Sequence, residues 1–224
     1  MNSRKWFITE WPLSLKKLSA DMLKNQYNNK LTSGFVLEKV AVKNITGKFI
    51  TKRIIKENIE DPFGSITEVS RISYDVIKFT INKDKLGLSI IDPPRSIKNF
   101  INILHEISGI GLSVSEVTID PLIWLHSIEN SIGKQDVTKI MASDINIHNK
   151  GLAKIEVVGK NDIRKEFTKF IQDKYHKVSS VKFNDNKMKS GSIILRCNGS
   201  IKIEGAIPDE IIDTISTSLM TLNS

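Results

Sequence analysis

The residue types that could carry chemistry are sparse in this chain, and one short pattern stands apart. The run Asp144-Ile145-Asn146-Ile147-His148 sits in a segment with strand-like composition. Alternate residues of a strand point to one face, so Asp144 and His148 would share a face. A carboxylate and an imidazole on one face are the residue types of a metal site or of an acid–base pair. A structural histidine and an unrelated exposed aspartate are the alternative.

No other motif for catalysis or cofactor binding is present in the sequence. The remaining histidines, His105, His126 and His176, lie far apart and have no metal-ligand spacing. There is no phosphate-binding glycine loop and no nucleophile elbow, and Cys197 adjoins a turn at the end of a strand-like run. We therefore expect no metal and no cofactor. Enzymatic activity stays an open question, and a non-catalytic protein is the favoured interpretation.

A strand, helix, strand pattern occurs twice along the chain. Residues 86–120 contain an apolar run, two prolines, a helical stripe that ends at Gly109, and a second apolar run; residues 152–185 repeat this order. Strand-like segments at 74–81 and 142–148 precede the two copies. The repeated unit is therefore strand, strand, helix, strand, although any α+β protein can be cut into two such pieces by chance.

This order of elements predicts an α+β fold with antiparallel sheets and helices packed on one face. Two tandem units of this kind resemble ferredoxin-like packing, an analogy that carries no function. We expect an N-terminal subdomain at residues 1–135 and a C-terminal subdomain at 136–224, each with one copy of the unit. Asp120-Pro121 is expected to start the helix that joins them.

Turn signals predict two hairpins. Residues 35–42 and 48–59 read as strands around a turn at 44–47. Asn198-Gly199 separates two short apolar runs and predicts a two-residue type I′ turn, because both residues tolerate positive φ. Residues 61–64, Asp-Pro-Phe-Gly, are expected to form a turn or loop.

The chain carries a net charge of +8, with 33 basic and 25 acidic residues, and the charge is uneven. Residues 1–60 hold 12 Lys/Arg against 5 Asp/Glu, and residues 150–202 hold 13 against 5. If these two basic regions meet on one face, they form a surface for a polyanion. If they lie on opposite faces, they only keep the protein in solution.

The first functional hypothesis is therefore a non-catalytic protein that contacts the nucleic-acid backbone without reading sequence. Lysines alternate with apolar residues in the strand that contains Lys52, and Lys165 lies on the polar side of a helix that begins near Asp162. No pattern for reading bases accompanies them. The predicted nucleic-acid contacts are Lys48, Lys52, Arg53, Lys56, Lys160, Arg164, Lys165 and Lys169.

The alternative hypothesis is a structural or adaptor subunit of a multiprotein assembly. Trp6 and Trp11 lie close together near the N-terminus, and tryptophan is enriched at interface hot spots, so this arm would contact a partner protein. Burial of the two rings in the protein's own core is the competing interpretation. The single Cys197 and the lack of a long apolar run lead us to expect a cytoplasmic protein without membrane contact.

Overall fold

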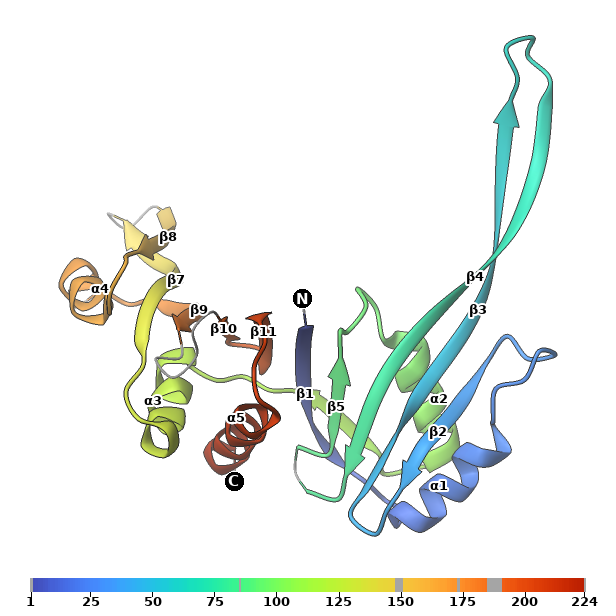
Figure 1. The fold of residues 1–224 in the computed structure, drawn as a ribbon, viewed down its shortest axis with the longest axis horizontal. Coiled ribbons are helices and arrows are strands. Elements are labelled where there is room, and N and C mark those ends of the chain that lie inside the picture. Colours follow the sequence, from blue (N-terminus) through green and yellow to red (C-terminus); the bar gives the residue numbers. More distant parts are fainter. Residues whose placement is uncertain (1, 85, 148–150, 173, 185–190, 224) are drawn as a thin grey trace. The chain divides into compact units, whose positions relative to one another are not determined.

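The computed structural model describes residues 2–84, 86–147, 151–172, 174–184 and 191–223, which contain five helices and eleven strands (Figure 1). The protein is α+β, as the order of elements predicts. Its chain forms two compact units, one made of Met1–Thr9 with Val114–Ser224 and the other of Glu10–Ser113. These bounds differ from the subdomains 1–135 and 136–224 expected from the sequence.

The unit Glu10–Ser113 is a four-stranded antiparallel sheet in the order β2-β3-β4-β5, with two helices. Its elements are α1 (Leu15–Lys24), β2 (Ser33–Val40), β3 (Asn44–Glu60), β4 (Ile66–Asn82), β5 (Leu88–Ile91) and α2 (Lys98–Ser108).

Four phenylalanines form the centre of its core. Phe49 of β3 and Phe79 of β4 point to the same face of the sheet, where Phe35 of β2 and Phe100 of α2 meet them at ring-centroid distances of 5.1–6.3 Å. All four side chains are almost completely buried. Aromatic rings bury large apolar areas, so this cluster attaches α2 to the sheet.

The unit formed by Met1–Thr9 and Val114–Ser224 contains antiparallel strands in the order β1-β11-β10-β9-β7-β8, with β6 paired to β1. Its elements are β1 (Asn2–Glu10), β6 (Ser113–Glu116), α3 (Pro121–Ile132), β7 (Asp136–Ile147), β8 (Gly151–Val158), α4 (Arg164–Ile171), β9 (Lys177–Asn184), β10 (Gly191–Arg196), β11 (Ser200–Gly205) and α5 (Asp209–Leu222).

Trp124 on α3 organises the helices of this unit. Its indole Nε1 donates to the Ile215 carbonyl at 3.2 Å and to Ser218 Oγ at 3.0 Å, both on α5. Trp6 of β1 packs edge-on against the same ring, with centroids 6.3 Å apart. Since the buried N–H is hydrogen-bonded, the full apolar area of the ring stabilises the core without an unsatisfied donor.

Two helix caps and both hairpins agree with the sequence patterns, but both turns differ from those expected. Residues 44–47, expected as the first turn, belong to β3, where residues 45–47 pair with β2, so residues 41–43 connect the two strands. Ser14 and Asp120 cap α1 and α3 through their side chains. The hairpin at residues 198–199 is confirmed, but the predicted two-residue turn is wrong. Arg196 pairs with Ser200, and within the three-residue connection only Gly199 has positive φ. Asn198 therefore does not adopt the conformation that a type I′ turn requires.

The repeated order of elements is present, but the strand pairing differs between copies. The first copy is β4-β5-α2-β6 and the second is β7-β8-α4-β9. In the second copy, β7 pairs with both β8 and β9; in the first, β4 pairs with β5, whereas β6 pairs with β1. The sheets therefore do not form a clear ferredoxin-like repeat.

Candidate functional site

Strands β3 and β4 extend well past the sheet to which they belong. Their ladder is continuous from Asn44 opposite Asn82 to Glu60 opposite Ile66. Strand β2 accompanies β3 only as far as Thr51, and β5 accompanies β4 only from Lys78 to Ile81. We call residues 52–74 the outer arm, which Figure 1 shows as a long two-stranded ribbon.

The outer arm exposes apolar side chains on both of its faces. Ile54 and Ile72 are directly opposite each other on one face, and Ile59 and Val69 lie on the other. Each is more than two-fifths exposed, and Ile54 reaches 65%. None of the helices in the described residues covers this part of the ladder, so its strand-forming side chains stay in solvent (Figure 1).

A structured turn carries the most exposed aromatic side chain of the described chain at the tip of the arm. Asp61 Oδ1 accepts hydrogen bonds from the backbone N–H of Phe63 at 2.8 Å and of Ser65 at 2.9 Å. Gly64, at φ 84°, supplies the left-handed residue that the turn needs. Hydrogen bonds from Ser65 and Phe63 lower the pKa of Asp61 below its ordinary value. Phe63 is 93% exposed, so the turn presents its ring to solvent.

Charge changes sign along the arm. Lys56 pairs with Glu68 and Arg71 with Glu57, both at 2.9 Å. Arg53 pairs with Asp75. From residue 57 to residue 68 the sequence has four acidic residues and no basic one. The end of the arm is therefore an acidic segment around an exposed phenylalanine.

The predicted nucleic-acid contacts on β3 do not form one unpaired basic row. The register puts Lys48, Lys52 and Lys56 on one face of the ribbon and Arg53 on the other. Lys48 is bound by Glu38 at 2.6 Å, and the partners of Arg53 and Lys56 are carboxylates of β4. Most of the positive charge of this strand is thus balanced locally.

The second set of predicted nucleic-acid contacts consists of one arginine that is paired with two carboxylates and three exposed lysines. Arg164 holds the Glu129 carboxylate at 2.8 Å and both oxygens of Asp162, and it also donates to the Gln135 carbonyl at 3.0 Å. These contacts raise the pKa of Arg164, the hydrogen bond that it donates to Asp162 most of all. Arg164 therefore connects α3, α4 and the start of β7.

Lys160, Lys165 and Lys169 are exposed and form no ion pair with the residues that the structure describes. They belong to the unit Met1–Thr9 with Val114–Ser224, whereas Lys48, Lys52, Arg53 and Lys56 belong to Glu10–Ser113. The two predicted sets therefore lie on separate compact units.

The two tryptophans of the predicted partner-binding arm have different surroundings. Trp6 is 3% exposed and packs on Trp124, so almost none of its ring is accessible. Trp11 is partly exposed, and its Nε1 is buried without a hydrogen-bond partner within the described structure. Core packing accounts for the position of Trp6.

Of the candidate pair Asp144 and His148, the structure describes Asp144. Asp144 lies at a bulge of β7 with φ 59°, and its carboxylate contacts Lys177 Nζ at 3.2 Å. That hydrogen bond raises the pKa of Lys177. His148 lies outside the described residues. Within the described part of the chain, no cluster of three or more His, Cys, Asp or Glu side chains has a geometry that could hold a metal ion.

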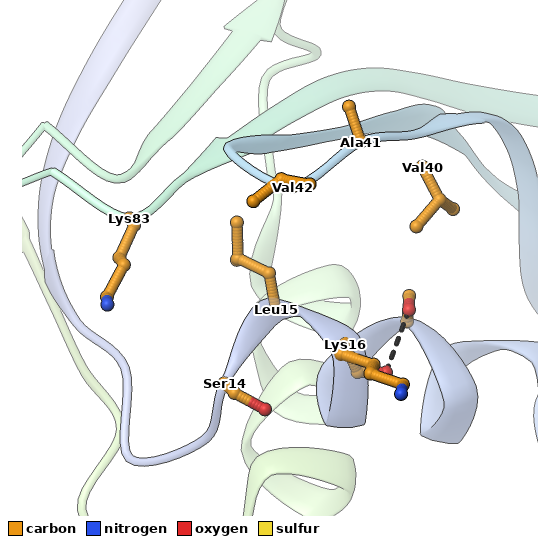
Figure 2. A pocket seen from close by; sticks show the side chains of 8 residues that line it. Ser14, Leu15, Lys16, Val40, Ala41, Val42 and Lys83 are labelled. Carbon is orange, nitrogen blue, oxygen red and sulfur yellow. Dashed lines mark hydrogen bonds between the residues drawn. The ribbon is translucent and has the colours of Figure 1, made fainter.

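A shallow apolar depression lies at the end of the ribbon opposite to the tip. It has a volume of about 500 Å³ between the start of α1 and the turn that joins β2 to β3. Figure 2 shows Leu15 directed from α1 toward Val42 of the turn, with Lys16 and Lys83 at the sides. The remaining lining residues are Ser14, Ser19, Val40 and Ala41.

A second depression, of about 340 Å³, lies between α3 and α4 in the other unit. His126 and His176 line it together with Arg164 and Phe167. His176 packs edge-on against Phe167, and Arg164 is occupied by two carboxylates. The Arg164 guanidinium and the His176 ring are therefore already engaged within this unit.

Comparison of the chain with known protein families and with curated proteins gives no match. None of the helices in the described residues has the length and apolar character needed to cross a membrane.

The outer arm and Phe63 were missed by reasoning from the sequence. The sequence pattern predicts a strand only at residues 74–81 and a turn or loop at 61–64, whereas β4 already begins at Ile66. The signal that could have found them is the length of the β-rich pattern on each side of Asp61, since β3 and β4 each have 17 residues. Strands of globular proteins usually have about 3–10 residues, so such length predicts an extension beyond the sheet.

Proposed function

We propose that this protein is a binding subunit of a multiprotein assembly and that its outer arm contacts a partner protein. One observation carries the proposal: residues 52–74 expose apolar side chains on both faces and at the tip. This keeps the adaptor hypothesis, but it moves the contact from the tryptophans to the arm, since Trp6 is buried.

The physics of a two-stranded ribbon supports this proposal. An isolated hairpin is marginally stable in water, and a hydrophobic face normally needs a third strand or a helix against it. Along the outer arm, the edges of both strands have no strand neighbour among the described residues. Free edges and exposed isoleucines are the features that strand addition and groove binding use.

The chemistry of the tip limits the kind of partner. Phe63 is a large apolar anchor, and the turn that Asp61 organises holds its backbone, so binding orders little additional chain. Glu60 and Asp61 come shortly before it and give the tip negative charge, whereas Glu57 and Glu68 are paired with Arg71 and Lys56. A polyanion would be repelled by this end of the arm, whereas a protein with an apolar pocket and a basic rim would be attracted.

Photo-crosslinking in the cells that produce the protein tests the proposal. A photoreactive phenylalanine analogue at position 63 should give a discrete protein adduct, and the same analogue at position 170 should not. Phe170 is the matched control because it is 63% exposed but lies on α4. Equal, diffuse labelling from both positions would contradict an arm-mediated contact.

A second candidate is contact with a nucleic-acid backbone through Lys160, Lys165 and Lys169. It is favoured by their exposure and by the absence of carboxylate partners among the described residues. Reversing the charge of Lys165 and Lys169 should weaken binding to labelled DNA or RNA and flatten its salt dependence. Unchanged affinity over a salt titration would remove this candidate.

Two further expectations stay proposals. The tandem strand, strand, helix, strand repeat is supported by the order of the elements, and greater identity between the copies in relatives would strengthen it. A cytoplasmic location is supported by the single cysteine, Cys197, which has no second cysteine for an internal disulfide. Cell fractionation would test the location.

A further inference from the structure

We propose that the partner of the outer arm is a second copy of this chain, in a head-to-tail contact. In this contact, Phe63 of one copy enters the apolar depression of the next copy, between the start of α1 and the β2–β3 turn. The inference rests on the proposed function, because it names the partner of the same arm. It uses the unit Glu10–Ser113 alone, which contains both the tip and the depression.

The size and lining of the depression fit an aromatic side chain. A volume of about 500 Å³ accommodates the ring of Phe63 together with the adjoining Pro62. Leu15, Val40 and Val42 supply the apolar lining. Val42 is 95% exposed at the rim, so an entering ring would remove it from water (Figure 2).

The charges of the two surfaces are complementary. With the ion-pair partners Lys56 and Arg71 included, residues 56–71 carry −2 in a chain of net charge +8, so the remainder carries +10. Lys16 and Lys83 flank the depression, and both are exposed. Glu60 and Asp61 come directly before Pro62 and Phe63, which brings a carboxylate pair to the two ammonium groups when the ring enters.

The tip cannot reach the depression of its own chain. The depression lies where β3 starts and β4 ends, and the tip lies where β3 ends and β4 starts. A 17-residue strand at about 3.3 Å per residue separates them by roughly 50 Å. Only a second copy can bring them together. The contact joins two different surfaces, so it continues into a ring or a filament.

Sedimentation velocity of the purified full-length protein over a wide concentration range tests the inference. The wild-type chain should form species larger than a dimer as concentration rises. Phe63→Asp removes the anchor and Val42→Asp puts charge into the depression. Each should weaken association by at least roughly 30-fold, the loss typical of a hot-spot residue. The controls Phe170→Asp and Val158→Asp change the same residue types at exposed positions of the other unit, 63% and 65% exposed, and should associate as the wild type does.

Mixing the two variants gives a sharper result. Phe63→Asp chains retain an intact depression, and Val42→Asp chains retain an intact tip. The mixture should therefore form a dimer and stop there, because the dimer presents no further working tip or depression. A mixture that stays monomeric, or that forms species larger than a dimer, would overturn the head-to-tail contact.

Exchanging the charges of Glu60 and Lys83 tests whether these two residues attract each other in the head-to-tail contact. Glu60→Lys and Lys83→Glu should each weaken association several-fold and reduce its sensitivity to salt. The double variant should regain most of the affinity, because the pair is restored with reversed sign. Additive losses in the double variant would show that Glu60 and Lys83 do not face each other.

Failure of this inference is distinguishable from failure of the proposed function. A purified chain that is monomeric at every concentration overturns self-association. If position 63 still crosslinks to a different protein in cells, the arm remains a protein-binding element. If the chain is monomeric and position 63 gives no specific adduct, both proposals fail.

Discussion

Strands β3 and β4 form one uninterrupted ladder, yet its two halves differ in every other respect. In the inner half, Phe49 and Ile77 face each other and are buried beneath the helices. In the outer half, Ile54 and Ile72 face each other in the same way and are more than half exposed. The two pairs lie on opposite faces of the ribbon, because successive residues of a strand alternate between its faces. On the face of Phe49 and Ile77, the outer half carries Ile59 and Val69, which are 55% and 43% exposed, so burial on this face ends where the arm begins.

This comparison separates what a strand needs to form from what it needs to be stable. Backbone pairing and β-branched residues are sufficient for the ribbon to continue past the sheet. Stability comes from burial, which the inner half obtains from α1, α2, β2 and β5. The outer half is therefore expected to bind something, and the following measurements test how different the halves are.

Stability should respond most strongly to the removal of a ring from the inner half. Phe49→Ala should lower the free energy of unfolding by about 3–5 kcal/mol, because a buried ring leaves a cavity. Phe63→Ala, the same change on the tip, should lower it by less than about 0.5 kcal/mol. Urea unfolding monitored by circular dichroism measures both, and similar losses would contradict the division into two halves.

Protection of the backbone amides from hydrogen exchange should fall along the β3–β4 ladder, from the inner half toward the tip. Amide protons of residues 52–60 and 66–74 should exchange with solvent at least roughly tenfold faster than those of residues 44–51 and 75–82, since few buried contacts hold the outer half closed. Hydrogen exchange followed by NMR gives the rates. Uniform protection in the dilute monomer would mean that the arm is stabilised in some other way.

Removing the arm should leave the body almost unchanged. Lys52 and Tyr74 are opposite each other, so an Asn-Gly turn can join them and replace residues 53–73. The free energy of unfolding should change by less than about 1 kcal/mol, because few buried contacts are lost. A variant that fails to fold would show that the outer half supports the inner half.

The smallest expected effect is the dependence of the turn at the tip on pH. Asp61 has a lowered pKa because it accepts hydrogen bonds from Ser65 and Phe63, so it stabilises the turn above the ordinary pKa of an aspartate. This contribution is lost as pH falls through the lowered value. NMR shifts of the Phe63 and Ser65 amides should report the loss. Asp61→Asn, which keeps the acceptor without titrating, should show a flat response.

Local features were predictable from the sequence where a single residue decides the geometry. The sequence predicts Asp120 as a helix cap, because its side chain satisfies the first free N–H groups, and Gly109 as the end of α2. The hairpin at Asn198-Gly199 was also found, although its turn type was wrong. These features depend on residues only a few positions apart.

The candidate site was not predictable in the same way. The sequence predicts a basic strand that contains Lys48, Lys52, Arg53 and Lys56. In the structure, the strand register places a carboxylate beside three of these side chains, from Glu38, Glu68 and Asp75. Arg164 likewise read as an exposed cation, and the fold gives it Glu129 from 35 residues away. Charge in a sequence says nothing about charge balance across strands, because the partners are distant along the chain.

By itself, the sequence determined the α+β class, the helix caps, the net charge and the low density of chemical motifs. Each depends on composition or on local spacing. Only the tertiary structure decided which half of the ribbon is covered, that Trp6 is core, and that an acidic Phe63 tip and an apolar depression lie at opposite ends of the same two strands. Those properties depend on long-range pairing and packing, for which neighbouring residues carry no signal.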